Sequence, residues 1–171
     1  MTERKGAVTM KGNPLTLLGE ARKPGDKLPE FTLIDNGLQA VSAAQTTGNV
    51  RIISVVPSLD TPICDQQTRR FNEEAAKLGE KIRILTVSMD LPFAQKRWCG
   101  AAGVDKVQTL SDYRDASFGG AMGTLIKELR LESRAIFVVD DKDVIRYVEY
   151  VPEIAQHPNY DQALEAARKL V

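Results

Sequence analysis

The run NVRIISVV at residues 49–56 restricts the fold of this chain more than any other feature, because it is continuously apolar and rich in β-branched residues. Such a run suits a β-strand that is buried on both faces of a sheet. A second run of this kind, IRILTVS, occupies residues 82–88. A sheet buried on both faces needs helices on both sides, so the two runs predict an α/β fold.

A helix is predicted between these two strands. Thr61 suits the N-cap position, Pro62 suits the first helical position, and Gly79 suits the stop after Leu78. The other predicted helices are 92–103, ending near Gly100 or Gly103, and 159–171, with Asn159 as the N-cap.

The remaining segments predict strands and an N-terminal hairpin. The further strands are 31–34, 106–112, 133–140 and 143–151, and the hairpin covers 7–18 around a turn at 11–14. This order of elements predicts a central mixed β-sheet flanked by helices, with all residues, 1–171, in a single domain.

Composition narrows the classes of function. Lys plus Arg and Asp plus Glu both number 23, so the net charge of zero indicates no nucleic-acid or anionic membrane partner. No apolar run approaches the roughly 20 residues of a membrane span. The first residues, MTERKGAVTM, lack the apolar segment of a secretory signal. We therefore expect a cytoplasmic protein without membrane or nucleic-acid partners.

The two cysteines, Cys64 and Cys99, are too few for a disulfide scaffold. A structural zinc site usually takes four Cys or His ligands, and the chain adds only His157 to the two cysteines. A zinc site would need a carboxylate as its fourth ligand, and the spacing matches no zinc pattern. A glycine-rich nucleotide motif is also absent. We therefore expect neither a metal nor a cofactor.

Cys64 falls in the first turn of the helix predicted to begin at Pro62. Unpaired backbone N–H groups and the positive end of the helix dipole face this turn, and both stabilise a thiolate. The dipole contributes only about 0.3–1 kcal/mol, so full ionisation at pH 7 needs a second cation. An arginine would serve better than the distant His157. The alternative is that Cys64 is a small buried side chain without reactivity.

The spacing Pro57-x-x-x-Thr61-x-x-Cys64 matches the PxxxTxxC active-site motif of the peroxiredoxins. The rest of the chain resembles one branch of that family, the bacterial thiol peroxidases of the atypical two-cysteine type. The similarity runs through nearly the whole chain and includes VTMKGNPLTLLGE, KRWCGAAGV, TLSD, FGGAMG and SRAIFVVD. It implies a thioredoxin-like fold with an N-terminal β-hairpin.

The resemblance also implies roles for five residues. Cys64 matches the peroxidatic nucleophile, Cys99 the resolving cysteine, and Arg134 the arginine of the active site. In the family, the hydroxyl of the residue matching Thr61 helps to hold the peroxide, and the proline matching Pro57 shields the thiolate.

The implied activity is the reduction of hydrogen peroxide and organic hydroperoxides to water and alcohols, as part of antioxidant defence. Cys64 becomes a sulfenic acid, Cys99 converts it into an intramolecular disulfide, and thioredoxin reduces the disulfide. Members of this branch form homodimers, so we expect a homodimer here. The two cysteines lie on different predicted helices, so we expect local unwinding before the disulfide forms.

Acidity alone does not explain a fast peroxidase. A thiol with the ordinary pKa of ~8.5 is about 3 per cent ionised at pH 7, so full ionisation gains only ~30-fold. The remaining rate must come from stabilising charge on the leaving oxygen, for which Arg134 and the Thr61 hydroxyl are the candidate donors.

Two other functions are compatible with parts of this pattern. A redox sensor or chaperone-like protein would keep the fold but act through binding linked to oxidation. A dithiol oxidoreductase is disfavoured because the chain has no C-x-x-C motif. One local difference from the family is that Pro62-Ile63 stands where many members carry Gly-Val. Pro62 would stiffen a turn that must unwind during the cycle.

Overall fold

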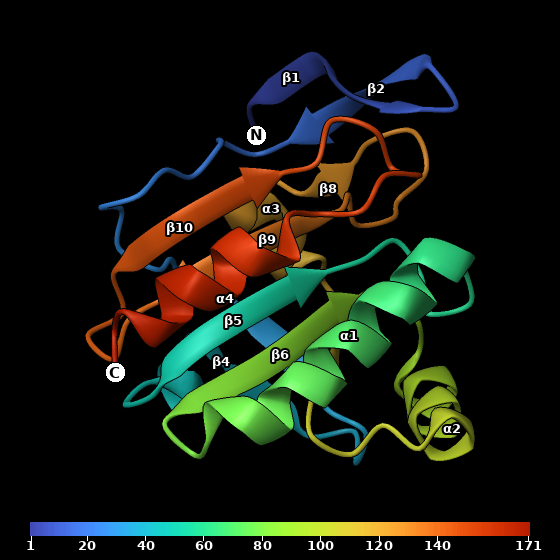
Figure 1. The fold of residues 1–171 in the computed structure, drawn as a ribbon. Helices are drawn as coiled ribbons and strands as arrows, with labels where there is room; N and C mark the ends of the chain where they lie inside the picture. Colours follow the sequence, from blue (N-terminus) through green and yellow to red (C-terminus); the bar gives the residue numbers. More distant parts are fainter.

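The computed structural model describes residues 1–171, and its centre is a mixed β-sheet of seven strands (Figure 1). The strand order is β10-β9-β5-β6-β7-β3-β4, in which β5, β6 and β7 run parallel and the other neighbours are antiparallel. The strands are β3 (Thr32–Ile34), β4 (Ala40–Ser42), β5 (Val50–Val55), β6 (Ile82–Ser88), β7 (Gln108–Ser111), β9 (Ala135–Val139) and β10 (Ile145–Tyr150).

Helices cover both faces of this sheet, with α1 and α4 on one face and α3 on the other (Figure 1). On β5, Ile52 packs in the cluster that contains Phe71 of α1, whereas Ile53 packs in the cluster that contains Phe118 of α3. Every residue of β5 is buried, as predicted for a strand covered on both sides. The helices are α1 (Pro62–Leu78), α2 (Pro92–Ala102), α3 (Ser117–Met122) and α4 (Tyr160–Arg168).

The N-terminal hairpin is present, but it is longer than the predicted 7–18. It consists of β1 (Glu3–Met10) and β2 (Asn13–Leu18), and β8 (Leu125–Ile126) adds a third strand to this separate small sheet. The turn contains Lys11 and Gly12 alone, not the four predicted residues, because both adopt positive φ, 51° and 80°. Two residues of this conformation suffice to reverse a hairpin.

Four short elements escaped prediction: β4, the 3₁₀ turn Ala43–Thr46, α3 and β8. Helix α3 contains two adjacent glycines and begins after Ala116, which has a φ of 53°, so its sequence carries no helical signal. The bounds of α1 and β6 match the prediction at both ends, and Asn159 caps α4 by accepting a hydrogen bond from the Gln162 N–H. None of the helices combines the length and apolar character required to span a membrane.

Candidate active site

Cys64 lies in the first turn of α1, as predicted, and its side chain is completely buried. It packs with Val56 and Leu59, which belong to the loop after β5, and Trp98 of α2 covers this cluster. Strand β5 ends one residue before Val56, so the loop delivers α1 directly from the buried centre of the sheet. The side chain of Cys64 is therefore enclosed by the loop that follows β5 and by α2.

The structure brings Arg134 to Cys64 across 70 positions of sequence. Arg134 is buried at the start of β9, and its Nη2 donates a hydrogen bond to Cys64 Sγ at 3.2 Å. Its Nε and Nη2 also donate to the Ile154 carbonyl at 2.9 and 2.8 Å. These bonds fix the plane of the guanidinium group, so a positive charge faces the sulfur in a site without water contact.

Gln67 completes the support of Arg134 and was not identified from the sequence. Its Oε1 accepts a hydrogen bond from Arg134 Nη1 at 2.8 Å, and its Nε2 donates to Ser54 Oγ of β5 at 2.6 Å. Gln67 stands three residues after Cys64, which places both on one face of α1. This spacing was the signal available in the sequence.

Thr61 occupies the N-cap position, as predicted, although its side chain makes no capping hydrogen bond. Its hydroxyl donates to the Ser58 carbonyl at 2.9 Å and accepts no hydrogen bond from the helix. Asp90 holds the same loop by accepting hydrogen bonds from Ser58 Oγ at 2.7 Å and from the Leu59 N–H at 2.8 Å. Thr61 is exposed beside the buried Cys64, and Pro57 is buried at the start of this loop.

Cys99 lies in the last turn of α2 and is partly buried. Its sulfur atom is 3.6 Å from Thr109 Oγ1 of β7, and Thr109 in turn donates to Asn36 Oδ1 at 3.1 Å. Burial raises the pKa of the Cys99 thiol, and the hydrogen bond with Thr109 opposes this shift. Cys64 and Cys99 are both free thiols with different hydrogen-bond partners.

Comparisons with known proteins identify the family to which this chain belongs. A model of the Redoxin family matches residues 23–164. The chain is 57% identical to a thiol peroxidase of Bacillus subtilis (strain 168), over 96% of this chain and 98% of that protein. It is 50% identical to a thiol peroxidase of Staphylococcus aureus (strain MRSA252), over 95% and 98% of the two chains. The chain belongs to the thiol peroxidase family.

The fold of this thiol peroxidase family member is similar to that of solved relatives. A peroxiredoxin-like protein from Aquifex aeolicus superimposes with a TM-score of 0.90 at 37% identity, with both chains fully covered. A thiol peroxidase from Chromobacterium violaceum gives a TM-score of 0.84 at 20% identity, with 95% of each chain covered, and supports the fold alone. The prediction of a thioredoxin-like fold with an N-terminal hairpin is confirmed.

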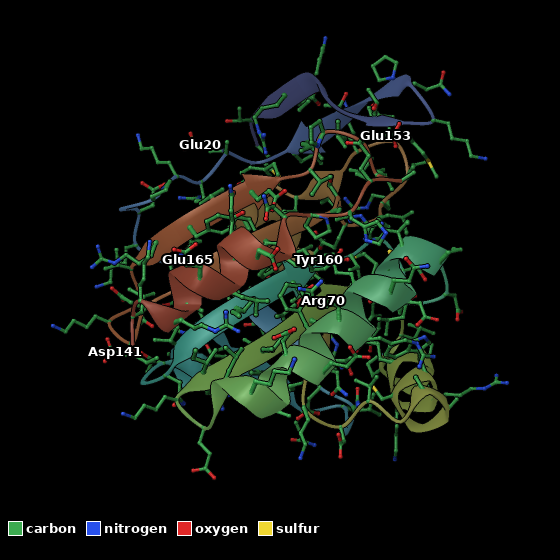
Figure 2. All side chains as sticks on the ribbon, viewed as in Figure 1. Glu20, Arg70, Asp141, Glu153, Tyr160 and Glu165 are labelled. Atoms are coloured by element: carbon green, nitrogen blue, oxygen red, sulfur yellow. The ribbon has the colours of Figure 1, made fainter.

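In this thiol peroxidase family member, the N-terminal hairpin supports Arg134 indirectly, through the segment that contains Ile154. The Ile154 N–H donates to the Thr9 carbonyl at 2.9 Å, so β1 fixes the segment whose carbonyl group holds Arg134. Glu153 adds to this contact by accepting hydrogen bonds from Thr9 Oγ1 and the Gly12 N–H, and it lies beside the hairpin in Figure 2. Sequence reasoning treated the hairpin only as a fold element.

Tyr160 is the first residue of α4, and its ring lies against α1. Its ring centroid lies 5.1 Å from the guanidinium carbon of Arg70 (Figure 2), and its hydroxyl is 2.8 Å from Nδ1 of the exposed His157. Burial is the main reason that the pKa of Tyr160 rises to about 12. No group of three or more His, Cys, Asp or Glu side chains lies close enough together to hold a metal ion.

Proposed function

We propose that this protein reduces hydrogen peroxide and organic hydroperoxides, with Cys64 as the peroxidatic cysteine and Cys99 as the resolving cysteine. The observation that supports the proposal most strongly is the 3.2 Å hydrogen bond from Arg134 Nη2 to the buried Cys64 sulfur. Membership of the thiol peroxidase family supports the reaction class. Arg134 and Thr61 act on the peroxide, and Pro57 shields the thiolate.

The first step is attack of the Cys64 thiolate on one peroxide oxygen. The S–O bond forms as the O–O bond breaks, and the leaving oxygen takes up a proton and departs as water or an alcohol. Arg134 is already held by Ile154 and Gln67, so it needs little reorganisation to stabilise the charge that develops on the leaving oxygen. Arg134 is therefore a stabiliser of the transition state in addition to a partner of the thiolate.

Peroxide reaches the sulfur through the surface around Thr61. A hollow of about 530 Å³ is lined by Leu59, Thr61, Pro62 and Trp98, among others, beside the turn that contains Cys64. The Cys64 side chain is completely buried, so access requires a small movement of this turn or of Trp98. Thr61 is the exposed hydroxyl closest in sequence to the sulfur and is suited to orient the incoming peroxide.

The second step joins the two cysteines. The Cys99 thiol attacks the Cys64 sulfenic acid, the S–S bond forms and water leaves. A disulfide needs the two Cα atoms within about 7 Å, and each sulfur is now held by a different partner. The first turn of α1 or the end of α2 therefore unwinds before this step. A dithiol of the thioredoxin type then reduces the disulfide by exchange in the cytoplasm.

Coupled peroxide consumption tests this function. Hydrogen peroxide is supplied to the wild type, Cys64→Ser and Cys99→Ser, with thioredoxin and its reductase as the electron source. We expect the wild type to turn over continuously and Cys64→Ser to fall to the uncatalysed background. Cys99→Ser is expected to complete one oxidation of Cys64 and then to stop. Peroxide-dependent binding of other proteins without peroxide consumption would instead favour a redox sensor.

We also propose that the protein forms a homodimer. Leu91 and Phe93, at the start of α2, are 52% and 67% exposed, and exposed apolar side chains that lie together in this way mark protein interaction sites. They line a hollow of about 610 Å³ together with Asp60 and Trp98, so this surface adjoins the loop of the active site. Sedimentation equilibrium should give a dimer for the wild type and a weaker association for Phe93→Asp. A monomeric wild type at micromolar concentration would contradict the proposal.

A further inference from the structure

Outside the active site, one carboxyl group is enclosed without a cation in contact. Glu132 lies between β8 and β9, two residues before Arg134, and its side chain is fully buried. The Thr124 hydroxyl donates a hydrogen bond to Glu132 Oε2 at 2.5 Å, whereas Oε1 has no hydrogen-bond donor. An ionised carboxylate is strongly disfavoured in such surroundings. The unpartnered oxygen atom therefore indicates a bound proton.

A second buried carboxyl group, that of Asp112, lies on the other side of the start of α3; it directly follows β7 and is 2% exposed. Its Oδ1 accepts the Phe118 N–H at 3.1 Å and its Oδ2 accepts the Gly119 N–H at 2.9 Å. Both carboxyl oxygens of Asp112 therefore already accept a backbone hydrogen bond from the start of α3.

The groups that face Glu132 act on its pKa in both directions, and those that raise the pKa have the larger effects. Burial has the largest effect on the pKa of Glu132, followed by the hydrogen bond and the negative charge of Asp112, and together they raise this pKa well above its ordinary value. Thr124 and the exposed Arg130 lower it, with smaller effects.

The backbone of α3 packs closely against this pair. A Cβ atom added to Gly119 would lie 2.8 Å from Glu132 Oε1 and 3.0 Å from Oε2, so a larger residue would displace the carboxyl group. The Ser133 N–H donates to the Thr124 carbonyl at 2.7 Å, which ties the same segment to the end of α3. The start of α3, its end and the start of β9 therefore meet at Glu132.

We propose that Glu132 and Asp112 share one proton, and that their hydrogen bond positions the segment that leads into Arg134. Glu132 is in this role a positioning residue and not a catalytic one. The shared proton gives Oε1 of Glu132 the partner that it lacks. Loss of the proton would place two negative charges in one buried site, two residues from Arg134, and their repulsion would displace this segment. The effect on catalysis rests on the proposed function, whereas the shared proton does not.

The sign of the pH dependence follows from the raised pKa. In the unfolded chain, Glu132 has a pKa of ~4.3, so its stabilising contribution is complete below about that pH. This contribution of Glu132 to the free energy of unfolding decreases as the pH rises above that value, until Glu132 also ionises in the folded protein. Over this pH range the folded state holds one more proton than the unfolded state, so the unfolding equilibrium constant increases by up to about tenfold for each unit of increase in pH. Glu132→Gln, which cannot ionise, should lack this part of the pH dependence.

Infrared spectroscopy of the full chain in D₂O tests the shared proton. At pH 6 an ordinary glutamate is about 98 per cent ionised, so few other carboxyl groups contribute. We expect the C=O band of a protonated carboxylic acid in the wild type and in the control Glu80→Gln, which changes an exposed glutamate, and no such band in Glu132→Gln. Absence of the band from the wild type would overturn the proposal, and this measurement requires no variant to fold.

The pH profile of Cys64 oxidation tests the positioning of Arg134. The rate of a single oxidation by hydrogen peroxide is measured across alkaline pH for the wild type and Glu132→Gln. We expect the wild-type rate to fall where its infrared band disappears, and the Glu132→Gln rate to persist to higher pH. Identical profiles beside a clear infrared band would show that the pair does not position Arg134. Failure of both proteins to react with peroxide would contradict the proposed function and leave the infrared result unaffected.

Discussion

The two cysteines lie at opposite ends of their helices, and their surroundings differ accordingly. Cys64 is in the first turn of α1, fully buried, with the Arg134 guanidinium group 3.2 Å from its sulfur. Cys99 is in the last turn of α2, partly buried, with the neutral Thr109 hydroxyl as its partner. The dipole of α1 favours a negative charge at Cys64, whereas the dipole of α2 disfavours one at Cys99.

This difference separates the two proposed tasks. A peroxidatic cysteine must be ionised before peroxide arrives, and a fixed cation serves that need. A resolving cysteine is required only after Cys64 has been oxidised, and a thiol whose pKa is raised by burial is protected from other oxidants until then. Helix α2 therefore contributes to both surroundings, because it partly buries Cys99 and places Trp98 against the cluster that contains Cys64.

The largest expected effect comes from removing the cation at Cys64. We expect Arg134→Ala to lower the rate of Cys64 oxidation by about 10²–10³-fold, as for loss of one transition-state donor. Loss of ionisation accounts for at most ~30-fold of this. The rate is followed in single turnovers by the fluorescence of Trp98, the sole tryptophan, and the thiolate fraction by its ultraviolet absorbance.

Arg134→Lys is the matched variant, because it keeps the charge and loses the planar fork that contacts Ile154, Gln67 and Cys64. Compared with Arg134→Ala, Arg134→Lys should restore the thiolate fraction of Cys64 more fully than the rate of Cys64 oxidation. If rate and thiolate fraction fell in proportion in both variants, Arg134 would act only on the ionisation of Cys64. Both proteins should first be shown to be folded, since Arg134→Ala leaves buried acceptors unpaired.

The contrast between the cysteines also shows what sequence reasoning can reach. The start of α1 was predictable, because Thr61, Pro62 and the buried strand before them carry strong local signals. The pairing of Cys64 with Arg134 has no local signal, since β9 reaches β5 only through the sheet, and here the family resemblance supplied the residue. The Ile154 carbonyl is a backbone group, so no side-chain pattern could have indicated it.

A smaller effect is expected at Cys99. When Cys99 ionises, the Thr109 hydroxyl can turn from Asn36 and donate to the sulfur, which opposes the rise of the Cys99 pKa. Thr109→Val should therefore raise this pKa further and slow alkylation of Cys99 severalfold near pH 8. The measurement uses a Cys64→Ser background, so that only Cys99 reacts. Thr86→Val is the matched control, since Thr86 is also buried on a neighbouring strand but its hydroxyl has no hydrogen-bond partner. Equal alkylation rates in the two variants would show that Thr109 does not influence Cys99.

The smallest effect concerns the turn that must open between the two cysteines. Pro62 is the first residue of α1 and is exposed, so its ring restricts the turn without filling the core. Pro62→Gly should favour the unwound turn by about 0.4–1 kcal/mol, which would accelerate disulfide formation about two- to fivefold. The first oxidation step should change less, because Ile154 and Gln67, which hold Arg134, lie outside this turn. Pro62→Ala should form the disulfide at a rate between those of the wild type and Pro62→Gly, since alanine removes the ring but keeps a preference for helix. Rapid-mixing fluorescence of Trp98 resolves the two steps, and an unchanged second step in Pro62→Gly would mean that α2, and not α1, limits the meeting of the two cysteines.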